Sequence, residues 1–265
     1  MSGTALFFHA LAPVLTANIL TATWLYAFTR ARGARSIHGR LRCMNRVGQV
    51  SVAERAPQFD ALFRERLRDL LKWRRDVRRF KRDKLAEGTI ERLIATACLA
   101  PSVGLSEPWR FVIVEDEARR AAIRSCFEDC NADALHAQSP DRASLYARLK
   151  LAGLDDAPYQ LAVFADRATA QGGGLGRLTM PETLDYSVVI AIHTLWLAAR
   201  AEGLGVGWVS ILDPGRIAAI LDVPRHWIFI GHLCVGYPAQ DDDTPALERQ
   251  GWEHRHAPSG AVLYR

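Results

Sequence analysis

Residues 182–201 carry apolar side chains nearly all the way around a helix, and no other stretch limits the possible folds as much. A helix with one apolar stripe lies on a surface, whereas a helix that is apolar on every side must be covered on every side. We therefore expect either a central helix or a helix shared between the two subunits of a dimer. Gly203 is expected to cap its end. The apolar residues are Leu184, Tyr186, Val188, Val189, Ile190, Ile192, Leu195, Trp196 and Leu197.

The rest of the chain alternates between helical and strand patterns, which indicates an α+β or α/β fold with helices on both faces of a sheet. The helix nearest the N-terminus is expected to bury one face, Thr89 to cap the next helix, and the tail from Gly236 to wrap over a neighbour. Asp213 and Pro214 have the N-cap and N1 pattern of a short helix. Other helices are predicted at 57–73, 90–99, 117–135 and 145–151, and strands at 111–114, 161–164, 206–212 and 228–235.

Residues 1–43 differ in composition from the rest, so we divide the chain into an N-terminal extension and a domain at 44–265. Residues 5–28 are almost entirely apolar, long enough to span a bilayer, and followed by arginines. Pro13 and Asn18 weaken such a span, and Met44 opens a chain of ordinary composition. Two interpretations stay open. The natural chain starts at Met44 and is cytoplasmic, which we favour, or the extension is a membrane anchor or targeting segment.

The charge distribution argues against a nucleic-acid partner. The 265 residues carry a net charge of +5, and residues 1–43 hold five arginines and no acid, so the remainder sums to zero. A neutral body offers no general basic surface to nucleic acid. The five cysteines are scattered and odd in number, which is typical of a reducing compartment, and no Cys or His group has zinc-site spacing. We expect no metal.

Residues 73–80 read Trp-Arg-Arg-Asp-Val-Arg-Arg-Phe and place four arginines directly after the first helix. Guanidinium groups bind phosphate through two parallel hydrogen bonds, so the cluster could receive a phosphorylated ligand. The alternative is a solvated basic helix end, stabilised by the helix dipole, with each arginine in a weak surface ion pair.

Two loops are rich in small residues. Residues 100–110 read Ala-Pro-Ser-Val-Gly-Leu-Ser-Glu-Pro-Trp-Arg and follow a helix that Pro101 ends. Residues 171–176 are glycine-rich, but Arg177 stands where a dinucleotide-binding fingerprint needs its last glycine, and no strand leads into them. We expect a flexible loop there.

Several segments together resemble the nitroreductase-like flavoproteins. They are Arg-Arg-Asp-Val-Arg-Arg-Phe at 74–80, the loop at 100–110, and Gly-Val-Gly-Trp-Val-Ser at 205–210. Residues 177–183 and 233–238 are similar to the members that break reduced FMN down to 5,6-dimethylbenzimidazole, the lower ligand of vitamin B12. The likeness covers about residues 67–255, with several motifs in the right order and spacing, and residues 1–50 lie outside it.

The resemblance implies an α+β FMN-binding fold, with a central mixed sheet flanked by helices and a dimer-swapped homodimer that holds the flavin at the subunit interface. It implies an oxidoreductase of cobalamin biosynthesis whose substrates are reduced FMN and molecular oxygen. Oxygen attacks the reduced ring, the flavin fragments, and dimethylbenzimidazole leaves with erythrose 4-phosphate. A separate NAD(P)H-dependent flavin reductase would supply the reduced FMN.

The resemblance also assigns the flavin contacts. Arg74, Arg75 and Arg78 would clamp the phosphate and ring carbonyls, and either Arg249 or Arg255 would add a contact from the tail. Backbone groups of the loop at 100–110 would hold the ring. The remaining contacts implied are Val77, Pro101, Ser102, Val103, Gly104, Gly207, Trp208 and Val209, with Met180 and Pro181 in a lid that excludes water.

Asp76 and Ser210 are the implied catalytic residues. Asp76 stands where ordinary nitroreductases often have Ser, and a carboxylate beside the flavin can accept or relay a proton. Ser210 would hydrogen-bond the flavin or its oxygen adduct. The simpler alternatives are that Asp76 pairs with Arg75 or Arg79, and that Ser210 is satisfied by backbone.

Two other functions stay open. An NAD(P)H-dependent nitroreductase or flavin reductase would share the fold and the arginines but would recycle FMN instead of destroying it. A non-catalytic flavin-binding protein, or a membrane-tethered scaffold, would use the N-terminal extension and tolerate loss of Asp76. The presence of Asp76 favours the FMN-fragmenting enzyme.

Overall fold

The computed structural model describes residues 56–147, 149, 152–257 and 261–265. The expectations for the N-terminal extension, for Met44 as a start and for a span at 5–28 lie outside these residues. Everything below concerns the compact unit Phe59–Arg265. Within the described part of the chain, no helix combines the length and the apolar character needed to cross a membrane.

The core of the fold is a four-stranded sheet with the order β1-β2-β4-β3. β1 (Trp109–Ile113), β2 (Tyr159–Asp166), β3 (Gly205–Val209) and β4 (Trp227–Gly236) pair in an antiparallel manner throughout. The expected mixed sheet is therefore corrected to an antiparallel one, with an isolated parallel bridge between Asp76 and Val206.

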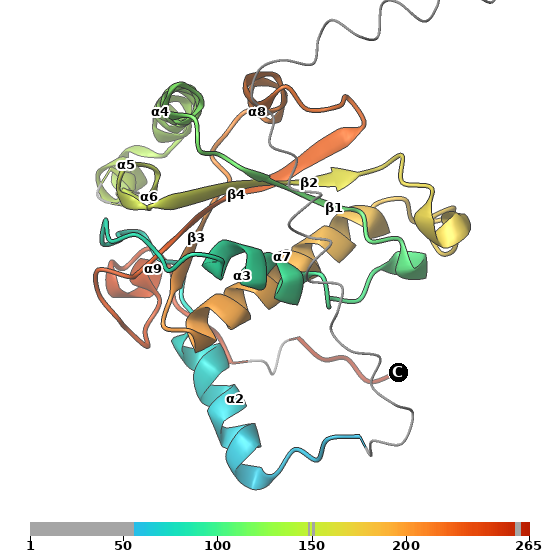
Figure 1. Ribbon diagram of the computed structural model, residues 1–265. Coiled ribbons are helices and arrows are strands. Elements are labelled where there is room, and N and C mark those ends of the chain that lie inside the picture. Colours follow the sequence, from blue (N-terminus) through green and yellow to red (C-terminus); the bar gives the residue numbers. More distant parts are fainter. Residues whose placement is uncertain (1–55, 148, 150–151, 258–260) are drawn as a thin grey trace, which may run out of the picture. The chain divides into compact units, whose positions relative to one another are not determined.

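Helices cover both faces of this sheet (Figure 1). α7 (Thr183–Ala201) and α3 (Thr89–Ala97) lie on one face, and α4 (Glu117–His136) and α8 (Pro214–Leu221) lie on the other. Alternate side chains of a strand point to opposite faces. Along β2, Leu161, Val163 and Ala165 accordingly join the core beneath α7, while Ala162 and Phe164 join the core beneath α4 and α8. This arrangement agrees with the predicted α+β class.

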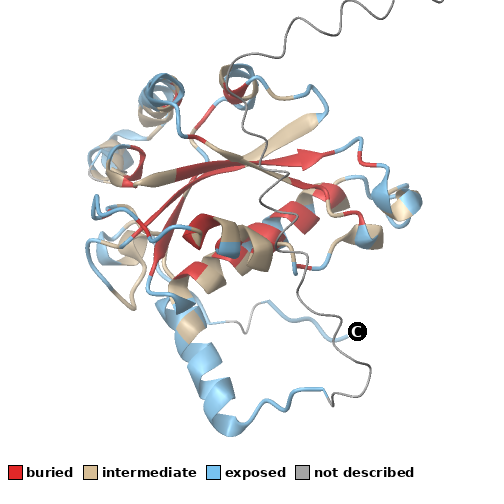
Figure 2. Cartoon of the chain, in the orientation of Figure 1, coloured by how far each residue is buried: buried red, intermediate tan, exposed pale blue. Residues whose placement is uncertain are grey.

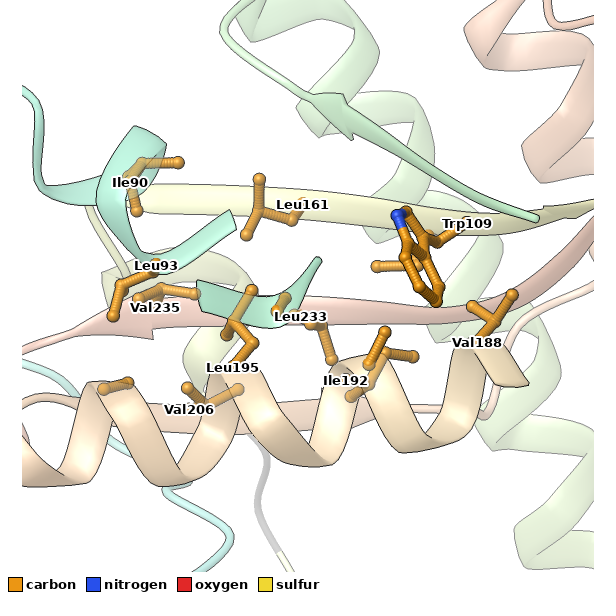
Figure 3. Close-up of a cluster of buried hydrophobic side chains, with 14 of the residues drawn as sticks. Ile90, Leu93, Trp109, Leu161, Val188, Ile192, Leu195, Val206, Leu233 and Val235 are labelled. Carbon is orange, nitrogen blue, oxygen red and sulfur yellow. The ribbon is translucent and has the colours of Figure 1, made fainter. Parts of the chain in front are cut away.

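One face of α7 is the centre of the larger core. Val188, Ile192 and Leu195 are fully buried and face strand residues such as Trp109, Leu161 and Leu233 (Figure 3). The other face is open in the single chain, because Tyr186 is 52% exposed and Ile190 is 42% exposed. The expectation that α7 is covered on every side is thus wrong for one subunit by itself. Gly203 does follow the helix with a positive φ of 74°, as a C-terminal cap requires.

α2 (Ala61–Trp73) buries no residue at all, so the buried face expected for this helix is also missing in the single chain (Figure 2). Asp60 caps it by accepting a hydrogen bond from the Phe63 backbone at 2.7 Å. Its apolar residues are nevertheless spaced to form one stripe. The exposed members are Leu62, Phe63, Leu67 and Leu71, with Phe59 just before the helix.

Some of the remaining helices and caps agree with the predictions from the sequence, and others do not. Asp213 caps α8 as predicted, accepting a hydrogen bond from the Arg216 backbone at 2.6 Å. Gly88, not Thr89, is the N-cap of α3, since Thr89 already has helical geometry. The helix expected at 145–151 overlaps only the end of α5 (Pro140–Tyr146), α6 (Gly153–Asp156) follows it, and residues 148, 150 and 151 lie outside the described part of the chain. Three short helical turns, η1 (Val103–Leu105), η2 (Gln171–Gly174) and α9 (Ala246–Arg249), complete the chain.

Candidate functional site

The arginine-rich segment runs from the end of α2 along the outer edge of β3. Arg74 is the C-cap residue of α2, and the Val77 backbone N–H donates to the Val206 carbonyl at 3.0 Å. Gly207 allows this close approach, because a Cβ atom there would lie 2.2 Å from the Val77 carbonyl oxygen. The edge of the sheet therefore fixes the backbone from which residues 75–79 project their side chains.

A cavity of about 390 Å³ opens beside this segment. Four arginines and two aspartates line it, which leaves a net charge of about +2 and favours an anion. The tail supplies the opposite wall, including the turn α9. The lining residues are Arg75, Asp76, Val77, Arg78, Arg79, Ala239, Gln240, Asp242, Thr244, Ala246, Arg249 and Gln250.

The tail also supplies carbonyl and carboxylate partners to the arginines. The Arg75 guanidinium donates to the Asp243 carbonyl, with its Nε at 3.0 Å, and Arg249 lies 2.9 Å from the Asp242 carboxylate. Burial lowers the pKa of Arg75, and the positive charge of Arg255 adds to this effect. Of the two tail arginines left open by the sequence, the structure places Arg249 on the cavity wall.

Arg74 lies elsewhere. Its guanidinium stacks over the Trp196 ring, 4.7 Å from the centroid, and it is not among the residues that line the cavity. Burial lowers the pKa of Arg74, and Asp76 opposes that shift. The contact is a cation–π interaction that ties the segment to α7. Of the arginines predicted to bind phosphate, Arg75, Arg78 and Arg249 line the cavity, together with Arg79, which was not predicted, while Arg74 takes a packing position.

Asp76 lies on the cavity wall and is held by the backbone of β3. Its carboxylate accepts a hydrogen bond from the Trp208 N–H at 2.9 Å, and Arg78 is the charged partner at 3.8 Å. The alternative of pairing with Arg75 or Arg79 is thus corrected, since Arg78 takes that place. Burial raises the pKa of Asp76, and the Trp208 N–H and Arg78 partly oppose the shift. The group is a fixed carboxylate beside a basic cavity, as a proton acceptor requires.

Ser210 and Trp208 lie on the same strand edge. Ser210 is exposed directly after β3 and follows Trp208 by two residues, which places it about 7 Å further along the strand. The Trp208 ring packs against Trp196 at 6.4 Å between centroids, and a Cβ atom at Gly231 would lie 2.1 Å from its Nε1 atom. Trp208 is therefore a packing residue in the single chain, and Ser210 stays accessible.

The 102–107 loop has an unusual backbone. Gly104, Leu105 and Glu107 have φ angles of 56°, 54° and 42°, a region that residues other than glycine rarely enter. The Val103 N–H donates to the Ser187 hydroxyl at 3.0 Å, and the Glu107 N–H donates to the Ser102 hydroxyl at 3.1 Å. Strained backbone of this kind persists where its surroundings hold it, and it is concentrated at functional sites.

The 102–107 loop contacts α7 near its start, and the arginine-rich segment that lines the cavity contacts α7 near its end. Ser187 binds the loop near the start of the helix, whereas the Trp196 indole donates to the Arg75 carbonyl at 3.2 Å near its end. The two residues are nine positions apart, which corresponds to about 14 Å along the helix. The expected flavin contacts are therefore split into two groups that a single chain does not bring together.

The lid residues and the tail were harder to place from sequence. Met180 is 48% exposed, and it and Pro181 lie between η2 and α7. Sequence reasoning missed Arg79, Gln240, Thr244 and Gln250 as lining residues. Arg79 could have been found from the arginine cluster, but no sequence motif in the tail indicates that it lies against the cavity.

Within the described ranges, no group of His, Cys, Asp and Glu side chains could hold a metal ion.

Comparison with known proteins gives a consistent assignment. The nitroreductase family profile matches residues 71–237. A 5,6-dimethylbenzimidazole synthase of Rhodospirillum rubrum is 59% identical over 199 residues, which cover 75% of this chain and 94% of that protein. Another 5,6-dimethylbenzimidazole synthase, of Rhodobacter capsulatus, is 49% identical over 195 residues, which cover 74% of this chain and 94% of that protein.

A solved structure supports the same fold. The crystal structure of an iodotyrosine deiodinase bound to FMN and 3-iodo-L-tyrosine superposes with a TM-score of 0.59 at 27% identity, covering 75% of this chain and 97% of that one. Sequence and architecture thus agree on one family. This chain belongs to the nitroreductase family.

Proposed function

We propose that the protein binds reduced FMN and, with molecular oxygen, fragments it to 5,6-dimethylbenzimidazole for cobalamin biosynthesis. The similarity to 5,6-dimethylbenzimidazole synthases at 59% and 49% identity supports this reaction. The structural observation that carries it is the position of Asp76, a carboxylate on the wall of an arginine-lined cavity. An enzyme that only recycled FMN would have less need of a carboxylate at this point.

The donor set of the cavity fits the phosphate of FMN. Arg75, Arg78, Arg79 and Arg249 offer guanidinium groups to a dianion, and charge-assisted bonds of this type are the strong ones. Asp242 holds Arg249 in an ion pair, and a bound phosphate would compete with that carboxylate for the guanidinium. Bound reduced FMN would supply the ring carbon atoms and the electrons that react with oxygen.

We propose that the complete site forms in a homodimer. The arginine cavity and the 102–107 loop lie at opposite ends of α7 in one chain, so an antiparallel arrangement of two copies could bring one subunit's cavity next to its partner's loop. The exposed apolar residues of α2 and the open face of α7 are suitable surfaces for such a contact. Exchange of terminal segments between the copies belongs to the same proposal.

Asp76 and Ser210 would act on the bound substrate in different ways. Asp76 is anchored by the Trp208 N–H, so its second carboxylate oxygen can take or return a proton beside the flavin. Ser210 would orient the substrate through its hydroxyl. The four cysteines in the described residues are free thiols, in keeping with a cytoplasmic enzyme to which a separate NAD(P)H-dependent flavin reductase delivers reduced FMN.

A comparison of FMN with riboflavin tests whether the arginine-lined cavity binds the phosphate, because the two flavins differ only by that group. Arg249→Gln is expected to weaken FMN binding at least tenfold and to leave riboflavin binding nearly unchanged. Arg225→Gln, at an exposed arginine between α8 and β4, is the matched control. Equal loss for both flavins, or no loss for either, would exclude Arg249 from phosphate binding.

A further inference from the structure

The glycine-rich 171–176 loop lies against the strained 102–107 loop. A Cβ atom at Gly172 would be 2.4 Å from the Gly104 carbonyl oxygen, and one at Gly104 would be 2.6 Å from the Leu175 carbonyl oxygen. Real Cβ atoms do not approach backbone this closely, so each loop needs glycine where it faces the other. The sequence suggested a flexible connection, but the two backbones are in contact.

Donor groups from residues 166–171 bind carbonyl groups of Leu105 and of residues next to the strained positions. The Gln171 amide nitrogen donates to the Leu105 carbonyl at 2.8 Å, and the Thr169 hydroxyl donates to the Ser106 carbonyl at 3.3 Å. The Asp166 N–H donates to the Pro108 carbonyl at 2.8 Å. Three successive contacts thus hold one side of the loop that contains the positive φ angles of Leu105 and Glu107.

We propose that Gln171 and Gly172 are positioning residues that hold the 102–107 loop in the backbone conformation needed against the flavin ring. This inference rests on the proposed function, in which that loop contacts the flavin. We call the contacts of Gln171 and Gly172 with the 102–107 loop the brace. Without it, Leu105 and Glu107 would relax toward negative φ values, and the loop would lose its preformed shape. The flavin would then have to order the loop as it binds, which lowers affinity.

Gly172 and Gly173 form a matched pair for the test. Both have positive φ, 79° and 58°, so alanine costs backbone strain at either position, but a Cβ atom at Gly173 meets nothing within 4 Å. Gly172→Ala is expected to weaken FMN binding and raise the KM for reduced FMN at least tenfold relative to Gly173→Ala. Gln171→Glu keeps the shape of the side chain but replaces the amide donor with a carboxylate. It is expected to weaken FMN binding and raise the KM for reduced FMN about threefold.

A readout without flavin separates this inference from the proposed function. In flavin-free protein, hydrogen exchange at the Leu105 and Ser106 amides should be faster in Gly172→Ala than in Gly173→Ala, with similar thermal midpoints for the two variants. The inference is overturned if wild-type protein binds FMN and Gly172→Ala, Gly173→Ala and Gln171→Glu bind it equally. If exchange responds as expected but wild-type protein binds no FMN, the proposed function fails and the brace remains only a structural contact.

Discussion

Asp76 is the residue on which the proposed chemistry depends. Its carboxylate is fixed by the Trp208 N–H and faced by Arg78, so it is positioned before any substrate arrives. Asn at this position keeps an oxygen acceptor for the N–H but carries no charge and is a poor proton acceptor. The residue can therefore be tested with little change in shape.

Asp76→Asn is expected to lower the yield of dimethylbenzimidazole at least tenfold while reduced FMN still binds, because the cavity keeps its four arginines. The product is measured by chromatography after a single turnover, and binding by equilibrium dialysis without oxygen. Asp83→Asn, at an exposed position, is the control and should change neither quantity. Full yield from Asp76→Asn would remove this carboxylate from the reaction. Ser210→Ala is expected to reduce the yield by a similar factor.

The pH dependence follows from the raised pKa of Asp76. Burial is the main cause, so the folded protein protonates this carboxyl at a higher pH than the ordinary value of 3.8. A reaction that needs the carboxylate must lose rate as pH falls through that raised pKa. We expect an acid limb in the pH profile of single-turnover fragmentation, and its disappearance from the residual activity of Asp76→Asn. An identical limb in the variant would assign it to another group.

His232 predicts a separate effect on stability. It is fully buried, its Nε2 atom lies 3.0 Å from the Gln160 amide oxygen, and burial lowers its pKa from 6.5 to about 3. The unfolded chain therefore binds a proton below pH 6.5 that the folded chain does not bind until about pH 3. Stability from this residue is present above pH 6.5 and is lost as pH falls, by about 2 kcal/mol between pH 6.5 and about pH 5.

Urea unfolding at several pH values measures this effect. His232→Gln is expected to be less stable than wild type at neutral pH, yet to lose about 2 kcal/mol less on going from pH 6.5 to about pH 5. His136→Gln, at an exposed histidine on α4, should keep the wild-type pH dependence. If the free energy of unfolding changed with pH in the same way in wild type and His232→Gln, the buried imidazole would not be the cause of the acid destabilisation.

At the scale of elements, α2 and α7 each leave apolar side chains without cover. The stripe on α2 and the open face of α7 would be costly in a lone subunit, because apolar area is favourably removed from water. Leu67→Asp places a charge in the stripe and is expected to give monomers with FMN affinity reduced at least tenfold. Arg66→Asp, on the neighbouring exposed position of α2, should stay dimeric. Light scattering measures the molar mass of both variants in solution. A Leu67→Asp variant that is still dimeric would exclude α2 from the interface.

The helices that periodicity and capping define clearly were predictable from sequence. α4, α7 and α8 were placed within a few residues, since long apolar repeats and the Asp213–Pro214 pair are local signals. α5 begins before the helix predicted at 145–151, because Pro140 is a start signal that the apolar spacing alone does not include. The antiparallel pairing of the sheet depends on contacts between distant strands, and short strands alternating with helices do not reveal it.

The same contrast appears in the candidate site. The arginine cluster could be recognised because its residues are adjacent in the chain. The position of Arg249 on the cavity wall, and the stacking of Arg74 on Trp196, depend on how the tail and α7 fold against the cluster. The role proposed for the 171–176 loop depends on a backbone contact that composition alone does not indicate.

At the scale of the whole molecule, the proposal divides the flavin site of one chain into two halves, which contact α7 about 14 Å apart. The basic cavity offers binding for a phosphate, and the strained loop at the other end offers a preformed backbone surface. Neither half alone accounts for a flavin enzyme. The proposed dimer, which would join the two halves, would also cover the apolar surface left open on α2 and α7.

The most direct test mixes purified protein with chemically reduced FMN and air and follows the fate of the flavin. The account predicts that dimethylbenzimidazole appears as FMN is lost, in wild-type protein and not in Asp76→Ala. Complete recovery of intact oxidised FMN from the wild-type reaction would contradict it and would point to a flavin reductase or a flavin-binding protein instead.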